Sequence, residues 1–547
     1  MTGMETNRRR LLQAGLSASS LFLPLPYAWV WSQQSDGALK LLRAPKVALV
    51  IGNGKYKDAP ALKNAPNDAQ SIGGALKATG FAVTLKLDLG REEMLEAIRT
   101  YVHLMEQKKH VGLFYFAGHG VQLDWRNYLL PIDAVIDRIE DVAKQSVDIA
   151  RLMEGLTKAA NPMNVIILDA CRENPFGTAK PVAQKGLSQM DAPTQTILAY
   201  ATSPGNVASD GDGANGLYTE NLLREIKVPE AKIEDVFKRV RLCVRRKSNG
   251  AQIPWESTSL EEDFWFIPPK NLAAASDSEK NKLFEEELAT WEKVKAASAP
   301  GPLEDFLRRW PSGPFSELAQ LQLDQVLARQ GEKKVQIVAA AGNPYTQGFV
   351  PADTNFKVGD TYAYTVMERE TRKELNRIGG TVTDITDNEV IFGGGVLILD
   401  RLGNTVKLPN GTRYTPRQDQ PTEFAIGKKW ATRFGVINPN GRTGETEFEF
   451  RITRREKITV PAGTFDCFVI EGEGYSNSPS GRLELKLTRW MAPDKVRRPI
   501  VLEQYRNFKR DLISKDGGFG RKGGGGKGPG GPQNLDQRQE LTSYKQA

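Results

Sequence analysis

Apolar runs and helical periodicities alternate along residues 45–268. Val47–Ile51 is a continuous apolar run, which is typical of a strand buried on both faces of a sheet. Val111–Ala117 and Val165–Asp169 are similar runs, whereas the apolar residues of Met94–Met105 recur at helical spacing. Strands that alternate with helices predict an α/β domain, with a mainly parallel sheet covered by helices on both faces.

The pattern changes after this domain. Residues 272–332 carry apolar residues at helical spacing, which predicts one or two helical hairpins resembling a tetratricopeptide-type unit. Residues 350–512 contain short strand-like segments, and Asn410-Gly411 and Asn440-Gly441 are typical hairpin turns, so we expect a separate antiparallel β-domain. Residues 513–547 are rich in glycine, which predicts a flexible tail without packing capacity.

Residues 1–35 have the pattern of an export signal. Arg8–Arg10 precede an uncharged, mostly apolar run, Ala14–Trp31. Paired arginines followed by two leucines resemble a bacterial twin-arginine signal, which implies export of the folded protein to the periplasm. Pro24 and Pro26 interrupt the run and argue against a spanning helix. An uncleaved anchor and a cytosolic amphipathic end are the alternatives, and membrane contact is expected only through this segment.

Composition excludes several functional classes. With 40% apolar and 26% charged residues, the chain is neither fully disordered nor a multi-span membrane protein. The net charge of +8 (74 basic and 66 acidic residues) is small for this length, and half of it lies in the two ends. A nucleic-acid partner is therefore not predicted. The basic stretch Lys238–Lys247 is predicted to be a solvated helix face rather than a partner site.

Two predicted strands end in reactive or small polar residues. Val111–Ala117 continues into Gly118-His119-Gly120, and Val165–Asp169 continues into Ala170-Cys171-Arg172. Ligands of open α/β sheets bind outside the carboxyl ends of the strands, so these two ends can lie side by side. A thiol and an imidazole placed there can act as a nucleophile and a proton-transfer group.

Residues 46–266 resemble a caspase-like domain of the bacterial metacaspase and orthocaspase group. The resemblance rests on three motifs in the expected order, Tyr115–Gly120, Leu168–Arg172 and Tyr200–Val207. His119 and Cys171 are 52 residues apart, close to the spacing of about 50 in caspases. The chain departs from the caspase motif at Asp169, where caspases have Gln, and at Glu173, where they have Gly. The resemblance implies a caspase fold and a cysteine endopeptidase.

The implied mechanism assigns a role to each motif residue. Cys171 attacks the scissile carbonyl as a thiolate, and a neighbouring imidazole helps because a free thiol with a pKa near 8.5 is mostly protonated at neutral pH. His119 then protonates the leaving amine, and water hydrolyses the thioester. The resemblance also implies that the N–H groups of Gly120 and Cys171 form the oxyanion hole.

Two other interpretations stay open. Cys171 can be a buried core thiol and His119 a turn histidine with only structural bonds, which would make the chain a catalytically idle caspase-like binding or scaffold protein of the cell envelope. Alternatively, the β-domain binds a lipid or another ligand, and the peptidase regulates it. The segment Val460–Phe465 resembles an envelope β-domain of unknown role.

Acidic residues suggest the substrate class. By resemblance, Asp169 and Asp68 match metacaspase pocket acids, and Asp210 falls where the caspase strand has its arginine. Carboxylates in a cleft attract Lys or Arg and repel Asp. We therefore predict protein or peptide substrates with Lys or Arg before the cut. The alternatives are a helix-terminus acid for Asp68 and an ordinary loop residue for Asp210.

No cofactor and no metal site are predicted. Three cysteines cannot form a disulfide framework, and the spacings of the three cysteines and three histidines do not support a metal cluster. Many metacaspases need calcium. The acids nearest to a calcium pattern do not match the four-aspartate arrangement of that family: Asp133, Asp137, Glu140 and Asp141. Calcium dependence is therefore possible for the family but not supported by this sequence.

Overall fold

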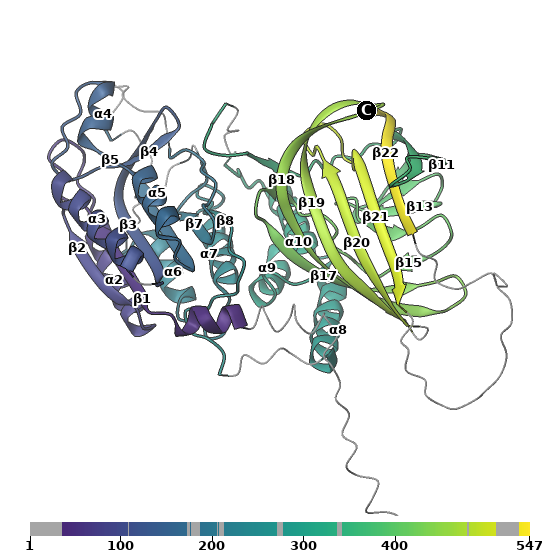
Figure 1. The fold of residues 1–547 in the computed structure, drawn as a ribbon, viewed down its shortest axis with the longest axis horizontal. Coiled ribbons are helices and arrows are strands. Elements are labelled where there is room, and N and C mark those ends of the chain that lie inside the picture. The colour runs from purple at the N-terminus through teal and green to yellow at the C-terminus, as the bar shows by residue number, and fades with distance from the viewer. Residues whose placement is uncertain are drawn as a thin grey trace, which may run out of the picture.

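A computed structural model describes residues 36–107, 109–171, 175–176, 186–204, 206, 213–270, 277–335, 342–478, 481–509 and 535–547. Figure 1 shows a sheet-and-helix domain on one side and a barrel on the other. The predicted export signal and Asp210 lie outside the described residues. Within the described part of the chain, every helix is too short or too polar to span a bilayer.

The first domain contains a mostly parallel sheet with the strand order β2-β1-β3-β6-β7-β8. These strands are β1 (Lys46–Gly52), β2 (Ala82–Leu87), β3 (Val111–Leu123), β6 (Met163–Cys171), β7 (Thr196–Tyr200) and β8 (Trp255–Thr258). Only the pairing of β8 with β7 is antiparallel along this order. Beyond its parallel part, β3 pairs with β4 (Arg126–Leu129), which pairs with β5 (Val147–Asp148).

Helices cover both faces of this sheet. They are α2 (Ala65–Ala78), α3 (Arg91–Gln107), α4 (Ile139–Gln145), α5 (Ile149–Ala159), α6 (Leu217–Glu225) and α7 (Ile233–Lys247). On β1, Val50 belongs to a core that also contains residues of α2, α6 and α7, whereas the adjacent Leu49 belongs to a second core with residues of α3 and α5. Successive side chains of a strand point to opposite faces, so a continuous apolar run fills both cores. The predicted α/β fold is confirmed.

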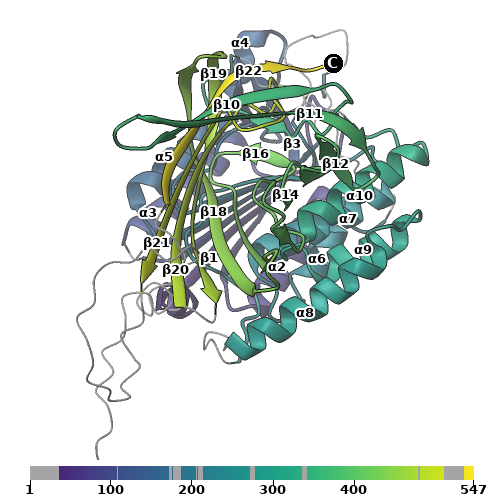
Figure 2. The ribbon, with the colours of Figure 1, turned by 90° about the vertical axis from the view of Figure 1, so that its right-hand side faces the viewer.

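Three helices follow, α8 (Asp277–Val294), α9 (Pro300–Arg309) and α10 (Ser316–Arg329). Trp291 packs against Phe306 and stacks on Phe315, with ring centroids 5.7 and 6.4 Å apart. Figure 1 shows these helices between the sheet domain and the barrel, and the turned view of Figure 2 shows them to one side of the barrel strands. The small aromatic core explains why so short a helical region holds together.

The antiparallel β-domain is a closed barrel. Its strands are β10 (Thr361–Glu368), β11 (Glu374–Ile385), β12 (Glu389–Phe392), β13 (Leu397–Asp400), β14 (Thr405–Lys407), β15 (Arg413–Tyr414), β17 (Lys429–Ile437), β18 (Thr443–Val460), β19 (Gly463–Ser478), β20 (Gly481–Met491), β21 (Val501–Lys509) and β22 (Leu535–Lys545). Two short strands, β9 (Phe349–Pro351) and β16 (Glu423–Ala425), form a separate pair.

One predicted boundary is wrong. Residues 513–547 were expected to be a tail without packing capacity, but β22 pairs with both β10 and β21 and closes the barrel. Leu541 on this strand is fully buried. A closed barrel leaves no unpaired strand edge, so a strand with few apolar residues is still held on both sides.

The basic face of α7 is also different from the prediction. Arg245 is only 4% exposed and forms ion pairs of 2.5 Å with Asp324 on α10 and with Glu332. Arg241 forms a 2.8 Å pair with Glu423 on β16. The expected solvated face is therefore an interface with the C-terminal parts of the chain, because these acids neutralise the arginines that the interface buries.

Candidate active site

The two predicted reactive residues lie where the parallel pairing of β3 with β6 ends. In the register of β3 and β6, Ala117 pairs with Asp169, Gly118 with Ala170 and His119 with Cys171. His119 and Cys171 thus lie opposite each other on the two neighbouring strands. The parallel register keeps neighbouring strand ends level, which explains how a motif on each strand produces one site.

The imidazole of His119 is held by two partners from the segment after β1. Its Nε2 lies 2.7 Å from the carbonyl oxygen of Pro60. Since a carbonyl can only accept, Nε2 carries the proton, and the neutral ring presents Nδ1 as an acceptor. The ring of Tyr56 lies 4.6 Å from the imidazole, and its hydroxyl oxygen accepts a 2.8 Å bond from the N–H of His119. His119 is 5% exposed, so its ring orientation is fixed by packing as well as by hydrogen bonds.

Two glycines flank His119 because the space beside them is occupied. A Cβ on Gly118 would lie 2.5 Å from the Tyr56 hydroxyl and 2.7 Å from Cζ of Phe116. A Cβ on Gly120 would lie 3.0 Å from the Cβ of Ala170. Any side chain at Gly118 would therefore push away the tyrosine that holds the histidine.

The backbone of β3 shows where the N–H of Gly120 points. The carbonyls of Ala117 and His119 accept bonds of 2.9 and 3.0 Å from Asn53 and Leu130, on the β1 and β4 side of the strand. Backbone groups alternate sides along an extended strand, so the N–H of Gly120 points to the other side, along which β6 ends at Cys171. This direction suits the predicted oxyanion hole, whose role stays a prediction.

Asp169 is half-buried at the end of β6 and accepts two hydroxyl bonds at the same oxygen. Its Oδ2 lies 2.6 Å from Oγ1 of Thr219 on α6 and 3.2 Å from Oη of Tyr115 on β3. The pKa of the Tyr115 phenol is raised well above its usual range, first by burial and then by the negative charges of Asp169 and Asp68. The structure thus brings these two predicted acids to the same tyrosine.

Asp68 has a positioning function that the sequence did not show. This residue on α2 is 3% exposed, and its Oδ1 accepts bonds of 2.8 Å from Asn215 and 3.0 Å from the N–H of Gly216. Gly216 directly precedes α6, so Asp68 fixes the start of the helix that carries Thr219. Asp210, the third predicted acid, lies outside the described residues.

Sequence reasoning missed four contributors to the site: Tyr56, Pro60, Tyr115 and Thr219. Pro60 acts through a main-chain oxygen, and Thr219 is an ordinary threonine on a helix, so neither leaves a signal in the sequence. Tyr115 lies inside a recognised motif, but there its apolar neighbours point only to a buried strand.

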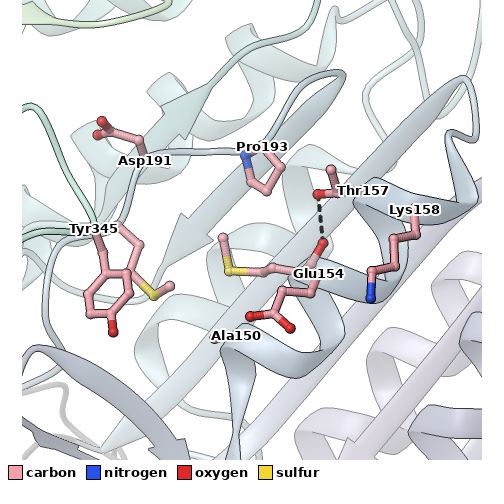
Figure 3. Close-up of a pocket in the computed structure, with 9 residues that line it drawn as sticks. Ala150, Glu154, Thr157, Lys158, Asp191, Pro193 and Tyr345 are labelled. Atoms are coloured by element: carbon pink, nitrogen blue, oxygen red, sulfur yellow. Dashed lines mark hydrogen bonds between the residues drawn. The ribbon is translucent and has the colours of Figure 1, made fainter.

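Other candidate sites contain none of the predicted site residues. Within the described ranges, no group of three or more His, Cys, Asp or Glu side chains could hold a metal ion. A cavity of about 370 Å³ lies between α5, the segment Met190–Pro193 and Tyr345 (Figure 3). Its lining is mostly apolar, with Glu154 and Lys158 at the α5 side.

The chain is similar to known proteins mainly over its first domain. A family model described as "Caspase domain" matches residues 45–265, and one described as "DUF3108-like" matches residues 437–505. Human mucosa-associated lymphoid tissue lymphoma translocation protein 1 is 28% identical over 217 residues, which cover 38% of this chain and 25% of that protein. Mouse caspase-1 is 22% identical over 293 residues, covering 49% of this chain and 71% of that one.

The matched segment therefore spans only a quarter of the human relative. A crystal structure of the Drosophila initiator caspase Dronc matches with 14% identity and a TM-score of 0.31, and covers 41% of this chain and 83% of that chain.

Proposed function

Residues 45–265 form a caspase domain, and from this premise we propose that the protein is a cysteine endopeptidase that hydrolyses peptide bonds after Lys or Arg. The observation that carries the proposal is the pairing of His119 with Cys171, where the parallel pairing of β3 with β6 ends. This pairing makes neighbours of a thiol residue and an imidazole residue, the two groups that nucleophilic catalysis by cysteine requires.

The first half of the reaction forms a thioester. Nδ1 of His119 takes the proton of the Cys171 thiol, and the thiolate attacks the scissile carbonyl carbon. The oxyanion of the tetrahedral intermediate accepts bonds from the N–H groups of Gly120 and Cys171. When the C–N bond breaks, His119 returns its proton to the leaving amine, and the acyl group stays on the sulfur.

The second half regenerates the thiol. His119 takes a proton from a water molecule, and the resulting hydroxide attacks the thioester carbon. When the C–S bond breaks, His119 returns that proton to the sulfur, and the acid product is released. Throughout the cycle Nε2 keeps its proton and donates a 2.7 Å hydrogen bond to the carbonyl oxygen of Pro60. The Pro60 oxygen thus fixes the tautomer and stabilises the imidazolium that forms twice per turnover.

The preference for Lys or Arg is supported by the acid at the end of β6. Asp169 lies two residues before Cys171, is half-buried, and accepts hydroxyl bonds that favour its ionised form. A carboxylate in this position attracts an ammonium or guanidinium group and repels an aspartate side chain.

The test is dye release from peptides that end in Arg, Lys or Asp before the cut. The wild-type protein should cleave the Arg and Lys peptides, and Cys171→Ala should abolish cleavage. Cys243→Ala, which removes a buried thiol from α7, serves as the matched control and should retain activity. If no peptide is cut, or if Cys171→Ala cuts equally well, the peptidase proposal fails. Cleavage of the Asp peptide alone would contradict only the substrate preference.

A further inference from the structure

Three side chains from three different elements form a hydrogen-bonded chain that ends on Asp169. Oη of Tyr115 lies 2.7 Å from Oγ1 of Thr219, and Oγ1 lies 2.6 Å from Oδ2 of Asp169. Tyr115 and Thr219 are both fully buried, so water does not compete for these bonds. Bonds of this length to a carboxylate are charge-assisted and stronger than those between neutral groups.

The hydrogen-bonding protons of these three side chains can be assigned. Thr219 has one hydroxyl proton, which it donates to Asp169. Tyr115 keeps its proton because burial raises the pKa of its phenol, and it donates to Thr219 or to Asp169 itself at 3.2 Å. Asp169 thus receives donors without needing to supply a proton, which favours its ionised form.

From this arrangement we propose that Thr219, supported by Tyr115, is a positioning residue for substrate selection: it holds the Asp169 carboxylate in place to meet the cationic side chain of the Lys or Arg before the cut. This inference rests on the proposed function, because it needs a basic substrate residue at Asp169.

The position of Thr219 depends in turn on Asp68. Asp68 accepts the N–H of Gly216 at 3.0 Å, immediately before α6 begins, and Thr219 lies in the first turn of that helix. The two acids therefore have different tasks. Asp68 is buried and fixes α6, whereas the half-buried Asp169 faces the substrate.

The charges around Asp169 favour a cation. The pKa of Tyr115 is raised by burial and by Asp169 and Asp68, and that of Tyr218 by burial, Asp169 and Glu256. Asp169 of β6 therefore acts on both phenols, whereas Asp68 of α2 acts on Tyr115 and Glu256 of β8 acts on Tyr218. A substrate ammonium or guanidinium that enters this field is attracted before it reaches Asp169.

The experiment measures steady-state cleavage of an Arg peptide and of the same peptide with citrulline, its neutral isostere. Thr219→Val removes the donor at nearly constant shape and should raise KM for the Arg peptide about tenfold, with kcat changed less than about twofold. KM for the citrulline peptide should stay unchanged. Thr219→Ser keeps the hydroxyl donor and should therefore show the wild-type KM for the Arg peptide. Tyr115→Phe should raise the KM for the Arg peptide severalfold.

Thr196→Val is the matched control. Thr196 is 1% exposed, lies at the other end of the same sheet at the start of β7, and donates to the carbonyl of Thr194. Its replacement should leave both KM values unchanged. The inference is overturned if Thr219→Val leaves the Arg KM unchanged, or if it affects both peptides equally or acts on kcat alone. A wild-type protein that cleaves no basic peptide would overturn the proposed function itself, and this inference with it.

Discussion

Nε2 of His119 lies 2.7 Å from the carbonyl oxygen of Pro60, so a main-chain atom determines which nitrogen of the imidazole carries the proton. The same segment provides Tyr56, whose hydroxyl accepts the His119 N–H at 2.8 Å. The loop after β1 therefore controls the geometry of a residue that lies about 60 positions further along the chain.

Gly118→Ala should impair catalysis without unfolding the protein. The new methyl group would lie 2.5 Å from the Tyr56 hydroxyl and would displace it, which loosens His119. A misplacement of about 1 Å at a reacting group costs up to about 10²-fold, so we expect kcat to fall by roughly 10- to 100-fold. Gly74→Ala on α2 is the control, since no atom lies within 4 Å of its added Cβ. Equal activity of both variants would contradict the clash.

The α/β fold could be predicted because its strands are continuous apolar runs between amphipathic helices. The position of the site on β3 and β6 could also be predicted, since a short motif marks each strand there. The actual β3 is longer than expected and continues through His119 to Leu123, where it pairs with β4. Gly118, His119 and Gly120 carry no strand signal, and only the pairing with a neighbouring strand keeps this stretch extended.

Contacts between distant residues were not predictable. Arg241 meets Glu423, which lies 182 positions later, and a run of charges on a helix has no feature that distinguishes this from a solvated face. In the barrel, Gly393, Gly394 and Gly395 all have positive φ and separate β12 from β13 within the mostly apolar run Val390–Ile398. β22 was missed because it follows a glycine-rich stretch and has few apolar residues.

Arg245→Met should destabilise the protein by about 3–5 kcal/mol, because it leaves Asp324 and Glu332 without the cation that both approach at 2.5 Å. The methionine keeps most of the side-chain volume, so the loss reports the charge. Arg308→Met, which breaks an exposed 2.9 Å pair with Asp305, should cost less than about 1 kcal/mol. Chemical denaturation of the three proteins gives both values. Similar losses for the two variants would show that the α7 interface does not depend on its buried arginine.

Asn343→Asp should loosen the segment that follows the second motif. Asn343 is 6% exposed and donates hydrogen bonds of 2.9 Å to Oγ of Ser188 and 2.8 Å to the carbonyl oxygen of Gln189. An aspartate of equal size has no donors and repels that carbonyl, at a cost of about 1–3 kcal/mol. Hydrogen exchange of residues 186–191 should accelerate.

A matched change tests this reasoning. Asn410→Asp in the β14–β15 turn keeps the side-chain hydrogen bond of this position, since Oδ1 of either residue can accept the Thr412 N–H, which lies 3.0 Å from Oδ1 of Asn410. Its exchange pattern should stay like that of the wild type. Figure 3 shows Asp191 and Tyr345 beside the cavity, and the Asp191 N–H donates 3.0 Å to the Tyr345 carbonyl. If residues 186–191 exchange at the wild-type rate in Asn343→Asp, this segment is held without Asn343.

Between pH 4.5 and about pH 8, Glu287 on α8 should dominate the pH dependence of the unfolding free energy. Burial raises the pKa of this carboxyl from 4.5 to about 8, against the weaker effect of the Phe315 N–H that donates to it at 3.2 Å. The folded protein therefore holds this proton while the unfolded chain releases it. The contribution of Glu287 is most favourable below pH 4.5 and becomes steadily less favourable as the pH rises towards 8.

Glu287→Gln should remove this dependence, because the amide is neutral at every pH and its oxygen still accepts the Phe315 N–H. Relative to the wild type, its unfolding free energy should rise between pH 5 and pH 8, by at most about 4 kcal/mol at the alkaline end. Glu286→Gln, a change at the exposed neighbour that pairs with Arg309, should follow the wild-type curve. Parallel curves for wild type and Glu287→Gln would mean that Glu287 is ionised in the folded protein and that water or a cation reaches it between α8 and α10.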